Sequence, residues 1–243
     1  LENPYLYELK TTLLQNGKVI DTSTHNSGFR YFTFNPDKGF ALNDTRMKVK
    51  GVCLHHDAGV LGSAVYRDVW KRRLLNLKEL GVNAIRTSHN PQAPAIYELC
   101  DELGLLVIDE AYDEWEFPKR KWIEGWNKGT PGFQGSFDFF EEWGEKDLGD
   151  LVKRDRNHLS VFAWSIGNEV DYPNDPYSHP ILAGDKGGFT QPIFGGYKKD
   201  APDAMRLGAI AKKLVAVVKQ YDKSRPTTAG LAGVAMSNET EYP

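Results

Sequence analysis

Ionisable and polar residues occur together at four points of the sequence, and each group directly follows a short apolar run. In chain order these groups are His55-His56-Asp57, Arg86-Thr87-Ser88-His89-Asn90, Asp109-Glu110 and Asn168-Glu169. Carboxyl, imidazole, amide and guanidinium groups can together perform general acid–base chemistry and bind a ligand with many hydroxyl groups. One polar group after an apolar run carries little information because loops are polar in general. Four in succession predict a functional site.

Glu169 is the residue that we predict to be catalytic. It follows the apolar run 161–166 through Gly167 and Asn168, so its carboxyl group can project into the site beside apolar walls. Partial desolvation raises the pKa of a carboxyl group, which suits a general acid near neutral pH. Asn168 offers a donor and an acceptor for a sugar hydroxyl. The alternative is that Asn168 and Glu169 only cap the next element.

The histidines and the arginine of the other groups are candidate binding residues. Imidazole rings at His55 and His89 can hydrogen-bond a polyhydroxylated ligand, although either histidine can equally be a core residue. A guanidinium at Arg86 would orient a carboxylate or lower its pKa. The alternative for Arg86 is an ion pair with Asp109 or Glu110 that joins neighbouring strands.

The same histidines also admit a metal-dependent hydrolase as an alternative. His55 and His56 are adjacent in an extended strand, so their side chains diverge and cannot easily bind one ion together. With Asp57 and His89 they form the candidate cluster, and a complete ligand shell would need a further carboxylate from Asp109, Glu114 or Glu116. We therefore predict no metal site.

Four tryptophans surround the third polar group: Trp115, Trp122, Trp126 and Trp143. An indole ring can stack on the apolar face of a sugar, and it can equally fix a loop onto its scaffold. We take Trp115 as a candidate substrate-binding residue and the other three as structural. The nearby run Lys119-Arg120-Lys121 is interpreted as a solvated face.

Strands alternate with helices from residue 46 onward, which predicts an α/β fold with a parallel sheet. The expected strands are 49–54, 83–86, 105–108, 161–166 and 226–231, and the expected helices are 66–80, 96–103, 139–157 and 207–221. A dinucleotide-binding sheet would need a Gly-rich turn after its first strand, where this chain has His55-His56-Asp57. The pattern instead predicts the N-terminal part of a TIM (β/α)8 barrel, about five βα units, with its site at the carboxyl ends of the strands.

The first 45 residues have the pattern of a different domain. Asn16-Gly17 predicts a hairpin, a further strand covers residues 29–34, and Asn43-Asp44 predicts a second turn. Three or four strands are too few for a closed sandwich. We therefore predict two domains: residues 1–45 are the C-terminal part of a β-sandwich with a lead-in hairpin, and residues 46–243 are a truncated barrel. The chain starts at Leu1 without a Met, so we expect sequence before it.

Composition narrows the classes of partner. The 243 residues are 40% hydrophobic and 26% charged with a net charge of -3, which argues against disorder and against nucleic acid as a partner. No apolar run approaches the roughly 18 residues of a membrane span.

Cys53 and Cys100 are expected to be buried free thiols. A partial barrel exposes sheet edges, so a homo-oligomer or a partner chain is expected. The compartment stays open between bacterial periplasm and cytoplasm.

Several of these segments resemble glycoside hydrolase family 2, the family of β-galactosidases and β-glucuronidases. The segments that carry the resemblance are 50–55, 83–91, 109–111 and 164–169, together with 147–169 as a whole. The resemblance extends over nearly the whole chain, and it identifies the β-sandwich of residues 1–45 as immunoglobulin-like. The combination of segments is specific to the family, whereas each segment alone would be less so.

The resemblance implies a retaining mechanism with two glutamates about 5–5.5 Å apart. Glu169 matches the acid/base, and Asn168 matches the residue that binds the sugar 2-hydroxyl. His55 and His89 match residues that contact the glycone, and Arg86 matches one that positions the nucleophile. The nucleophilic glutamate belongs to a later strand outside this chain, so we expect the chain alone to be inactive.

The substrate implied by the resemblance is a terminal β-galactoside, because the loop 109–115 looks more like bacterial β-galactosidases. The partner would then be a carbohydrate, either a β-galactoside oligosaccharide or a glycoconjugate. A β-glucuronidase, another β-glycosidase of the family and a non-catalytic carbohydrate-binding fragment remain alternatives. No cofactor is required. Some family members bind Mg²⁺ through the third loop, but residues 112–116 lack the histidine of those members, so we do not expect the ion.

Overall fold

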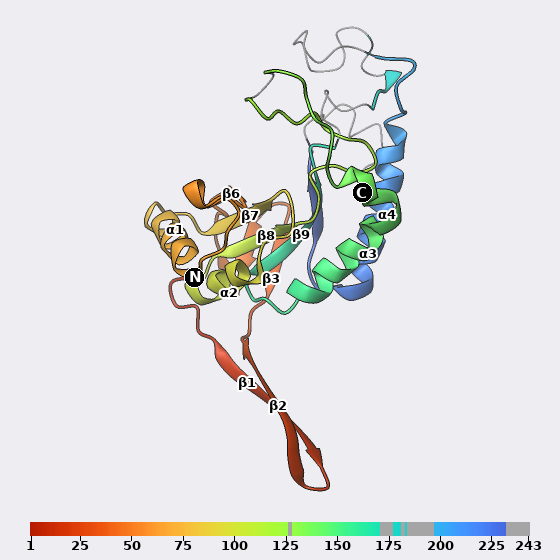
Figure 1. Ribbon diagram of the computed structural model, residues 1–243. Coiled ribbons are helices and arrows are strands. Elements are labelled where there is room, and N and C mark those ends of the chain that lie inside the picture. Colours follow the sequence, from red (N-terminus) through yellow and green to blue (C-terminus); the bar gives the residue numbers. More distant parts are fainter. Residues whose placement is uncertain (126–127, 171–176, 181–182, 184–196, 232–243) are drawn as a thin grey trace. The chain divides into compact units, whose positions relative to one another are not determined.

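The computed structural model describes residues 1–125, 128–170, 177–180, 183 and 197–231 (Figure 1). The chain divides into two compact units, and each is described by itself. The first unit contains residues 1–87, 92–109 and 155–162. The second contains residues 88–91, 110–154 and 163–243. Among the described residues, none of the helices is long and apolar enough to span a membrane.

The first unit begins with antiparallel structure. Strands β1 (Tyr7–Gln15) and β2 (Lys18–Ser27) form a hairpin, and β3 (Phe32–Asn35), β4 (Gly39–Leu42) and β5 (Thr45–Arg46) form a three-stranded sheet. The Asn16-Gly17 turn has positive φ at both residues, 49° and 77°, and so does Asn43-Asp44, 48° and 65°. Both turns fall where the sequence predicts them, because Asn, Asp and Gly tolerate the left-handed conformation that such turns need.

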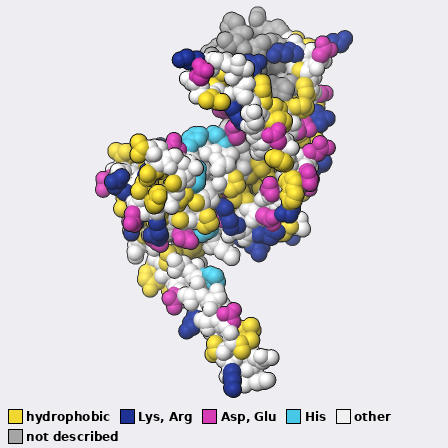
Figure 2. Space-filling view, in the orientation of Figure 1, with side chains coloured by type: hydrophobic (Ala, Val, Ile, Leu, Met, Phe, Trp, Pro, Cys, Tyr) yellow, Lys and Arg dark blue, Asp and Glu magenta, His cyan; other side chains and the backbone are white. Residues whose placement is uncertain are grey.

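The hairpin of β1 and β2 is a ribbon with apolar side chains exposed on it. Figure 2 shows hydrophobic groups along this ribbon, and the large ones that are more than half exposed are Tyr7, Leu9, Leu13, Leu14, Val19 and Ile20. A two-stranded ribbon buries too little apolar surface to be stable alone in water. The assignment of these strands to a β-sandwich domain, which would cover the apolar side chains, stays a prediction.

The rest of the first unit contains three strands and two α-helices of the βα pattern. They are β6 (Gly51–His55), the short 3₁₀ helix η1 (Gly59–Leu61), α1 (Arg67–Glu79), β7 (Ala84–Ser88), α2 (Pro94–Leu103) and β8 (Leu106–Glu110). Strands β7 and β8 pair in parallel, with Ala84 opposite Leu106. Trp70 and Leu74 of α1 and Ile96 and Leu99 of α2 are fully buried. The apolar spacing that predicts the two helices thus marks their buried faces.

The second unit contains α3 (Phe137–Asp155), β9 (Val161–Asn168), α4 (Met205–Tyr221) and β10 (Thr227–Gly230). Asp155, at the end of α3, and the first two residues of β9 belong to the first unit. All eight residues of β9 are buried, as expected of a strand covered on both faces. Strand β10 pairs in parallel with β9, with Thr227 opposite Trp164. The sheet order is β10-β9-β8-β7-β6, so strands that follow one another in the chain are neighbours in the sheet. This order confirms the predicted parallel sheet of five successive strands.

The two cysteines differ in burial. Cys100 of α2 is a buried free thiol, as predicted, and burial raises its pKa. Cys53 is free but exposed, so the expectation of a buried thiol is wrong there. Side chains alternate along a strand, and in β6 the buried face belongs to Leu54. Cys53 therefore lies on the other face, where its Sγ is 3.6 Å from Arg86 Nη1.

A buried carboxyl group fixes the end of α4 in the second unit. Asp222 is 6% exposed and accepts hydrogen bonds from Trp164 Nε1 at 2.8 Å, Arg225 Nη1 at 2.6 Å and Ser224 Oγ at 2.6 Å. Burial alone would raise the pKa of Asp222. The bonds from Ser224, Trp164 and Arg225 outweigh it and hold this pKa well below its ordinary value.

Asp222→Asn is therefore expected to destabilise the full-length protein at pH 7 by about 2–3 kcal/mol. A carboxyl group whose folded pKa is depressed stabilises the fold above its unfolded pKa of about 4, and this stabilisation is lost as the pH falls below that value. The difference between wild type and variant should shrink from pH 7 to pH 3 in urea unfolding. Asp150→Asn is the control, because Asp150 is exposed and pairs only with surface lysines. An equal difference at both pH values would contradict the prediction.

Candidate functional site

The second unit contains a buried glutamate that orients a histidine. Glu110, the last residue of β8, is fully buried, and its Oε1 lies 2.6 Å from His89 Nδ1. Ser165 of β9 donates its hydroxyl to Glu110 Oε2 at 2.7 Å. The contact between Glu110 Oε1 and His89 Nδ1 is a hydrogen bond in which the tautomer of the imidazole sets the donor. This contact fixes the orientation of the imidazole ring, as carboxylates bonded to ligand-binding histidines do in other sites.

A second group of side chains fixes Asn168, the last residue of β9. The Asn168 amide donates from Nδ2 to Asp113 Oδ1 at 2.8 Å. Lys119 Nζ donates to the same Asp113 oxygen at 3.0 Å and to the main-chain oxygen of Asn168 at 2.6 Å. Burial by itself would raise the pKa of Asp113, but the charge of Lys119 and the bonds from Asn168 and Lys119 lower it. Asp113 is therefore ionised at neutral pH, and the direction of the Asn168 amide is set.

Glu169 directly follows β9 and has a left-handed backbone, with φ at 45°. Its amide donates to the main-chain oxygen of Gly230 in β10 at 2.5 Å. The residue is exposed, although all eight residues of β9 before it are buried. The described residues leave Glu169 exposed, and the apolar walls expected around it stay a prediction. The positive φ ends the strand at Asn168, so Glu169 does not continue the buried run.

The lysines of the third loop were missed by sequence reasoning. The prediction of a solvated face at residues 119–121 is wrong for Lys119, whose side chain is 17% exposed. Lys121 Nζ donates to Glu114 Oε2 at 2.6 Å, and Glu114 is 2% exposed. Opposite charges a few residues apart, Asp113-Glu114 and then Lys119 and Lys121, were the available signal. They indicate ion pairs within one loop rather than a solvated run.

Trp115 lies inside the second unit. It is 1% exposed, and its indole N–H donates to the main-chain oxygen of Ile166 at 2.8 Å. Its ring stacks with Phe140 of α3, with centroids 6.4 Å apart. This burial supports a structural role, and a sugar contact by Trp115 stays a prediction. Of the other loop tryptophans, Trp122 is half-buried, Trp143 is exposed, and Trp126 lies outside the described residues.

The structure places two of the predicted binding residues in the first unit. His55 is the exposed last residue of β6. Arg86 is half-buried in β7, where Nη1 approaches Cys53 Sγ. In the same unit Asp109 accepts a hydrogen bond from the buried Tyr97 hydroxyl at 2.7 Å. The second unit thus contains the pair His89–Glu110 and the strand end Asn168-Glu169, and the roles of His55 and Arg86 stay predictions.

The described residues contain no group of three or more His, Cys, Asp or Glu side chains that could hold a metal ion. In the third loop, Asp113 Oδ1 binds the ammonium group of Lys119, and Glu114 Oε2 binds that of Lys121. These carboxylate oxygens already have a cationic partner. A Mg²⁺ ion needs several oxygen ligands, and at these two oxygens it would have to displace the ammonium groups.

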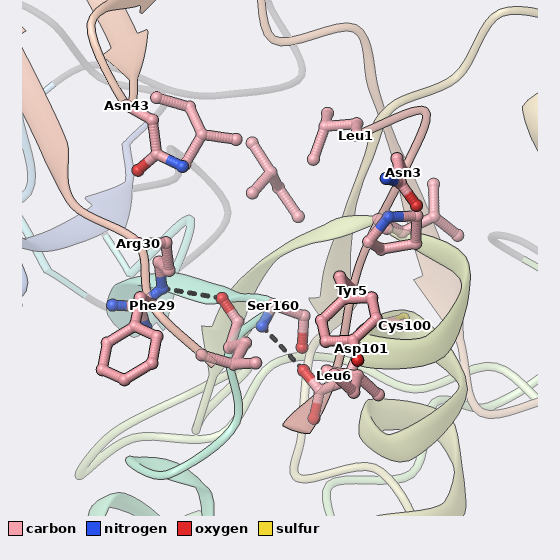
Figure 3. Close-up of a pocket in the computed structure, with 16 residues that line it drawn as sticks. Leu1, Asn3, Tyr5, Leu6, Phe29, Arg30, Asn43, Cys100, Asp101 and Ser160 are labelled. Carbon is pink, nitrogen blue, oxygen red and sulfur yellow. Dashed lines mark hydrogen bonds between the residues drawn. The ribbon is translucent and has the colours of Figure 1, made fainter. Parts of the chain in front are cut away.

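A separate cavity lies in the first unit (Figure 3). It has a volume of about 150 Å³ and lies among the N-terminal segment, the end of α2 and the starts of β8 and β9. Its polar groups bind the main chain: Arg30 Nε donates to Leu159 O at 2.8 Å, and the Ser160 amide donates to Asp101 Oδ1 at 2.7 Å. None of the predicted site residues lines it. This cavity is therefore distinct from the candidate site.

Comparison with known families decides the assignment of the fold. Residues 36–240 match the family model described as "Glycosyl hydrolases family 2, TIM barrel domain", and residues 1–30 match the model "Glycosyl hydrolases family 2". The chain belongs to glycosyl hydrolases family 2. The five parallel strands are accordingly part of a TIM barrel domain, as the sequence predicts. The domain boundary at residue 45 stays a prediction.

Relatives in this family carry two different activity names. The chain is 39% identical to the β-galactosidase BoGH2A of Bacteroides ovatus over 95% of this chain and 26% of that protein. It is 43% identical to a putative β-glucuronidase of Formosa agariphila over 70% of this chain and 15% of that protein. A family 2 glycosyl hydrolase of Bacteroides cellulosilyticus has a similar structure, with a TM-score of 0.74 and 35% identity over 97% of this chain.

The chain is much shorter than the relatives that it matches. It spans 26% of the Bacteroides ovatus protein, 15% of the Formosa agariphila protein and 25% of the Bacteroides cellulosilyticus chain. Membership of the family is thus established for residues 1–243. These 243 residues alone do not establish the activity and substrate of the whole protein.

Proposed function

We propose that the full-length protein containing this chain is a retaining glycoside hydrolase that cleaves terminal β-glycosides, with Glu169 as its general acid/base. The observation that carries the proposal is the position of Asn168 and Glu169 at the carboxyl end of the buried strand β9. Active sites of TIM barrels are built at this end of the strands. Asn168 is fixed there by Asp113 and Lys119, as a residue that grips one hydroxyl group must be.

In the proposed mechanism Glu169 acts twice. It first protonates the glycosidic oxygen as the aglycone leaves, and it then removes a proton from the water that releases the sugar from the enzyme. Asn168 binds the sugar 2-hydroxyl, and His89, oriented by Glu110, contacts the glycone. His55 is a further glycone contact, and Arg86 positions the nucleophile. The nucleophilic glutamate lies outside residues 1–243, so these residues alone are proposed to be inactive.

A β-galactoside is the substrate that we propose. The loop 109–115 supports it, as does the similarity to the Bacteroides ovatus β-galactosidase along 95% of the chain. A β-glucuronide is the second candidate, supported by the 43% identity to the putative β-glucuronidase over 70% of the chain. The two glycones differ at C4, where the hydroxyl is axial in a galactoside and equatorial in a glucuronide, and at C6, where a glucuronide carries a carboxylate and a galactoside a hydroxymethyl group. A β-glucuronidase would therefore need cationic groups at that position.

Hydrolysis of matched 4-nitrophenyl β-galactoside, β-glucuronide and β-mannoside by the full-length protein tests the proposal. We expect kcat/KM to be highest for the galactoside by at least about tenfold, since a site that binds a hydroxyl strongly rejects analogues that leave its polar groups unpaired. Proton NMR should show the β-anomer as the first product. A preference for the glucuronide would transfer the substrate assignment to the second candidate. An α-anomer as first product, or no turnover of any glycoside, would contradict the mechanism.

A further inference from the structure

The backbone of Glu169 has an unfavourable conformation, which contacts with neighbouring groups must stabilise. Its φ of 45° lies in the left-handed region, which residues with a β-carbon rarely adopt. Such residues persist where the surrounding structure fixes them, and they occur often at functional sites. The direction of the Glu169 carboxyl group depends on this φ. The groups that fix the peptide bond before Glu169 therefore also aim its side chain.

That peptide bond is held at both of its polar atoms. Its carbonyl oxygen, Asn168 O, accepts a hydrogen bond from Lys119 Nζ at 2.6 Å. Its amide, Glu169 N, donates to Gly230 O in β10 at 2.5 Å. The bond from Lys119 carries a full positive charge, and charge-assisted hydrogen bonds are about twice as strong as neutral ones. The ammonium group thus brings a charge to this peptide from a different loop.

Lys119 is itself held in place. Its Nζ also donates to Asp113 Oδ1 at 3.0 Å, and that oxygen accepts the Asn168 amide at 2.8 Å. The main-chain amide of Lys119 donates to Glu114 Oε2 at 2.8 Å. With only 17% of its side chain exposed, Lys119 is shielded from most of the solvent that weakens surface ion pairs. One ammonium group therefore links the carboxylate that orients Asn168 to the peptide that orients Glu169.

We propose that Lys119 is a positioning residue, which fixes the peptide between Asn168 and Glu169 and so aims the acid/base and the hydroxyl-binding amide together. The proposal rests on the proposed function, because it assigns Lys119 a role through Glu169. Lys119 touches no reacting atom in this role. Its removal would leave the glycosidic bond and the nucleophile unaffected, but it would release the strained φ of Glu169.

The test uses the full-length protein, two aryl β-galactosides and the variant Lys119→Met, which keeps the length of the side chain and removes the charge. A phenyl galactoside has a poor leaving group that needs a proton from Glu169, whereas a 2,4-dinitrophenyl galactoside has one that leaves without it. We expect Lys119→Met to lower kcat/KM for the phenyl substrate about 10–100-fold more than for the dinitrophenyl substrate. Lys119→Arg should recover part of this loss, because it restores the charge.

Lys121→Met is the matched control. Lys121 lies in the same loop, and its Nζ bonds buried Glu114 and the main-chain oxygen of Lys119 rather than the peptide before Glu169. A substitution that only disturbs the fold should lower kcat/KM for the two substrates by the same factor, and this is expected for Lys121→Met. Equal losses for both substrates in Lys119→Met would overturn the positioning role.

Glu169→Gln, measured in the same series, separates this inference from the proposed function. If Glu169→Gln shows a strong dependence on the leaving group and Lys119→Met shows none, the positioning role fails and the proposed function stands. If Glu169→Gln shows no such dependence, the acid/base assignment fails, and the role of Lys119 fails with it.

Discussion

Glu169→Gln in the full-length protein is expected to lower kcat/KM for a phenyl β-galactoside by about 10²–10⁴-fold. Glutamine has nearly the same shape as glutamate but cannot donate an acidic proton to the glycosidic oxygen. The proton matters only when the leaving group is a strong base. For a 2,4-dinitrophenyl galactoside we therefore expect the first step to change by less than about tenfold. The measurement is steady-state hydrolysis of both substrates by wild type and variant.

Glu169 is also expected to assist the second step, in which water removes the sugar from the enzyme. In Glu169→Ala no carboxylate remains to activate water, so the glycosyl-enzyme intermediate should accumulate with the dinitrophenyl substrate. Azide needs no general base, and it should attack the anomeric carbon, displace the nucleophilic carboxylate and give the β-galactosyl azide. Restored turnover together with this product would identify Glu169 as the acid/base. Hydrolysis unchanged in Glu169→Gln on both substrates would exclude that role.

Strand ends are the most informative feature of the sequence. Apolar runs and Gly104 predict the ends of β7, α2 and β8 to within a few residues. This is possible because hydrophobic periodicity and turn chemistry are local properties of the sequence. The turns at Asn16-Gly17 and Asn43-Asp44 are predictable for the same reason. Once the strands are parallel and consecutive, their carboxyl ends share one edge of the sheet. For this reason the amino-acid sequence alone predicts that His89, Glu110 and Asn168 lie at the same edge of the sheet.

Contacts that depend on burial cannot be predicted in this way. Lys119 and Asn168 are 49 residues apart, and nothing local to either residue shows that an ammonium group binds the main chain of β9. Glu169 is exposed and has a left-handed φ, which glutamate adopts rarely, so its sequence neighbours give no sign of this conformation. The apolar segment around Cys53 predicts a buried thiol. Only the burial pattern of β6 shows that Leu54 takes the buried face.

The amino-acid sequence also does not show where an aromatic side chain points. Trp115 lies in a loop near polar strand ends, where an indole could stack on a sugar or fix the loop, and the sequence is the same in both cases. The structure shows the indole 1% exposed and bonded to Ile166 O. It also shows Gly167 against the ring: a β-carbon there would lie 3.0 Å from Trp115 Cζ2. The indole thus packs on the strand that ends at Asn168.

Trp115→Ala is expected to destabilise the full-length protein by about 3–5 kcal/mol, because it leaves a large cavity against β9 and an unpaired carbonyl at Ile166. Trp115→Phe should cost less, since it keeps an aromatic ring and loses only the hydrogen bond and part of the packing. Urea unfolding followed by circular dichroism measures both losses. We expect a lower midpoint for each variant, with the larger shift in Trp115→Ala.

Kinetics of Trp115→Phe then separate the structural role from the sugar contact. If the indole only supports β9, KM for the aryl galactoside should stay within about twofold of wild type, because the sugar does not touch the ring. A rise in KM of about tenfold with no loss of stability would instead show that Trp115 binds the glycone. The first result is expected from the burial of the indole, since a ring enclosed by Phe140, Gly167 and Ile166 offers no face to a ligand in the described residues.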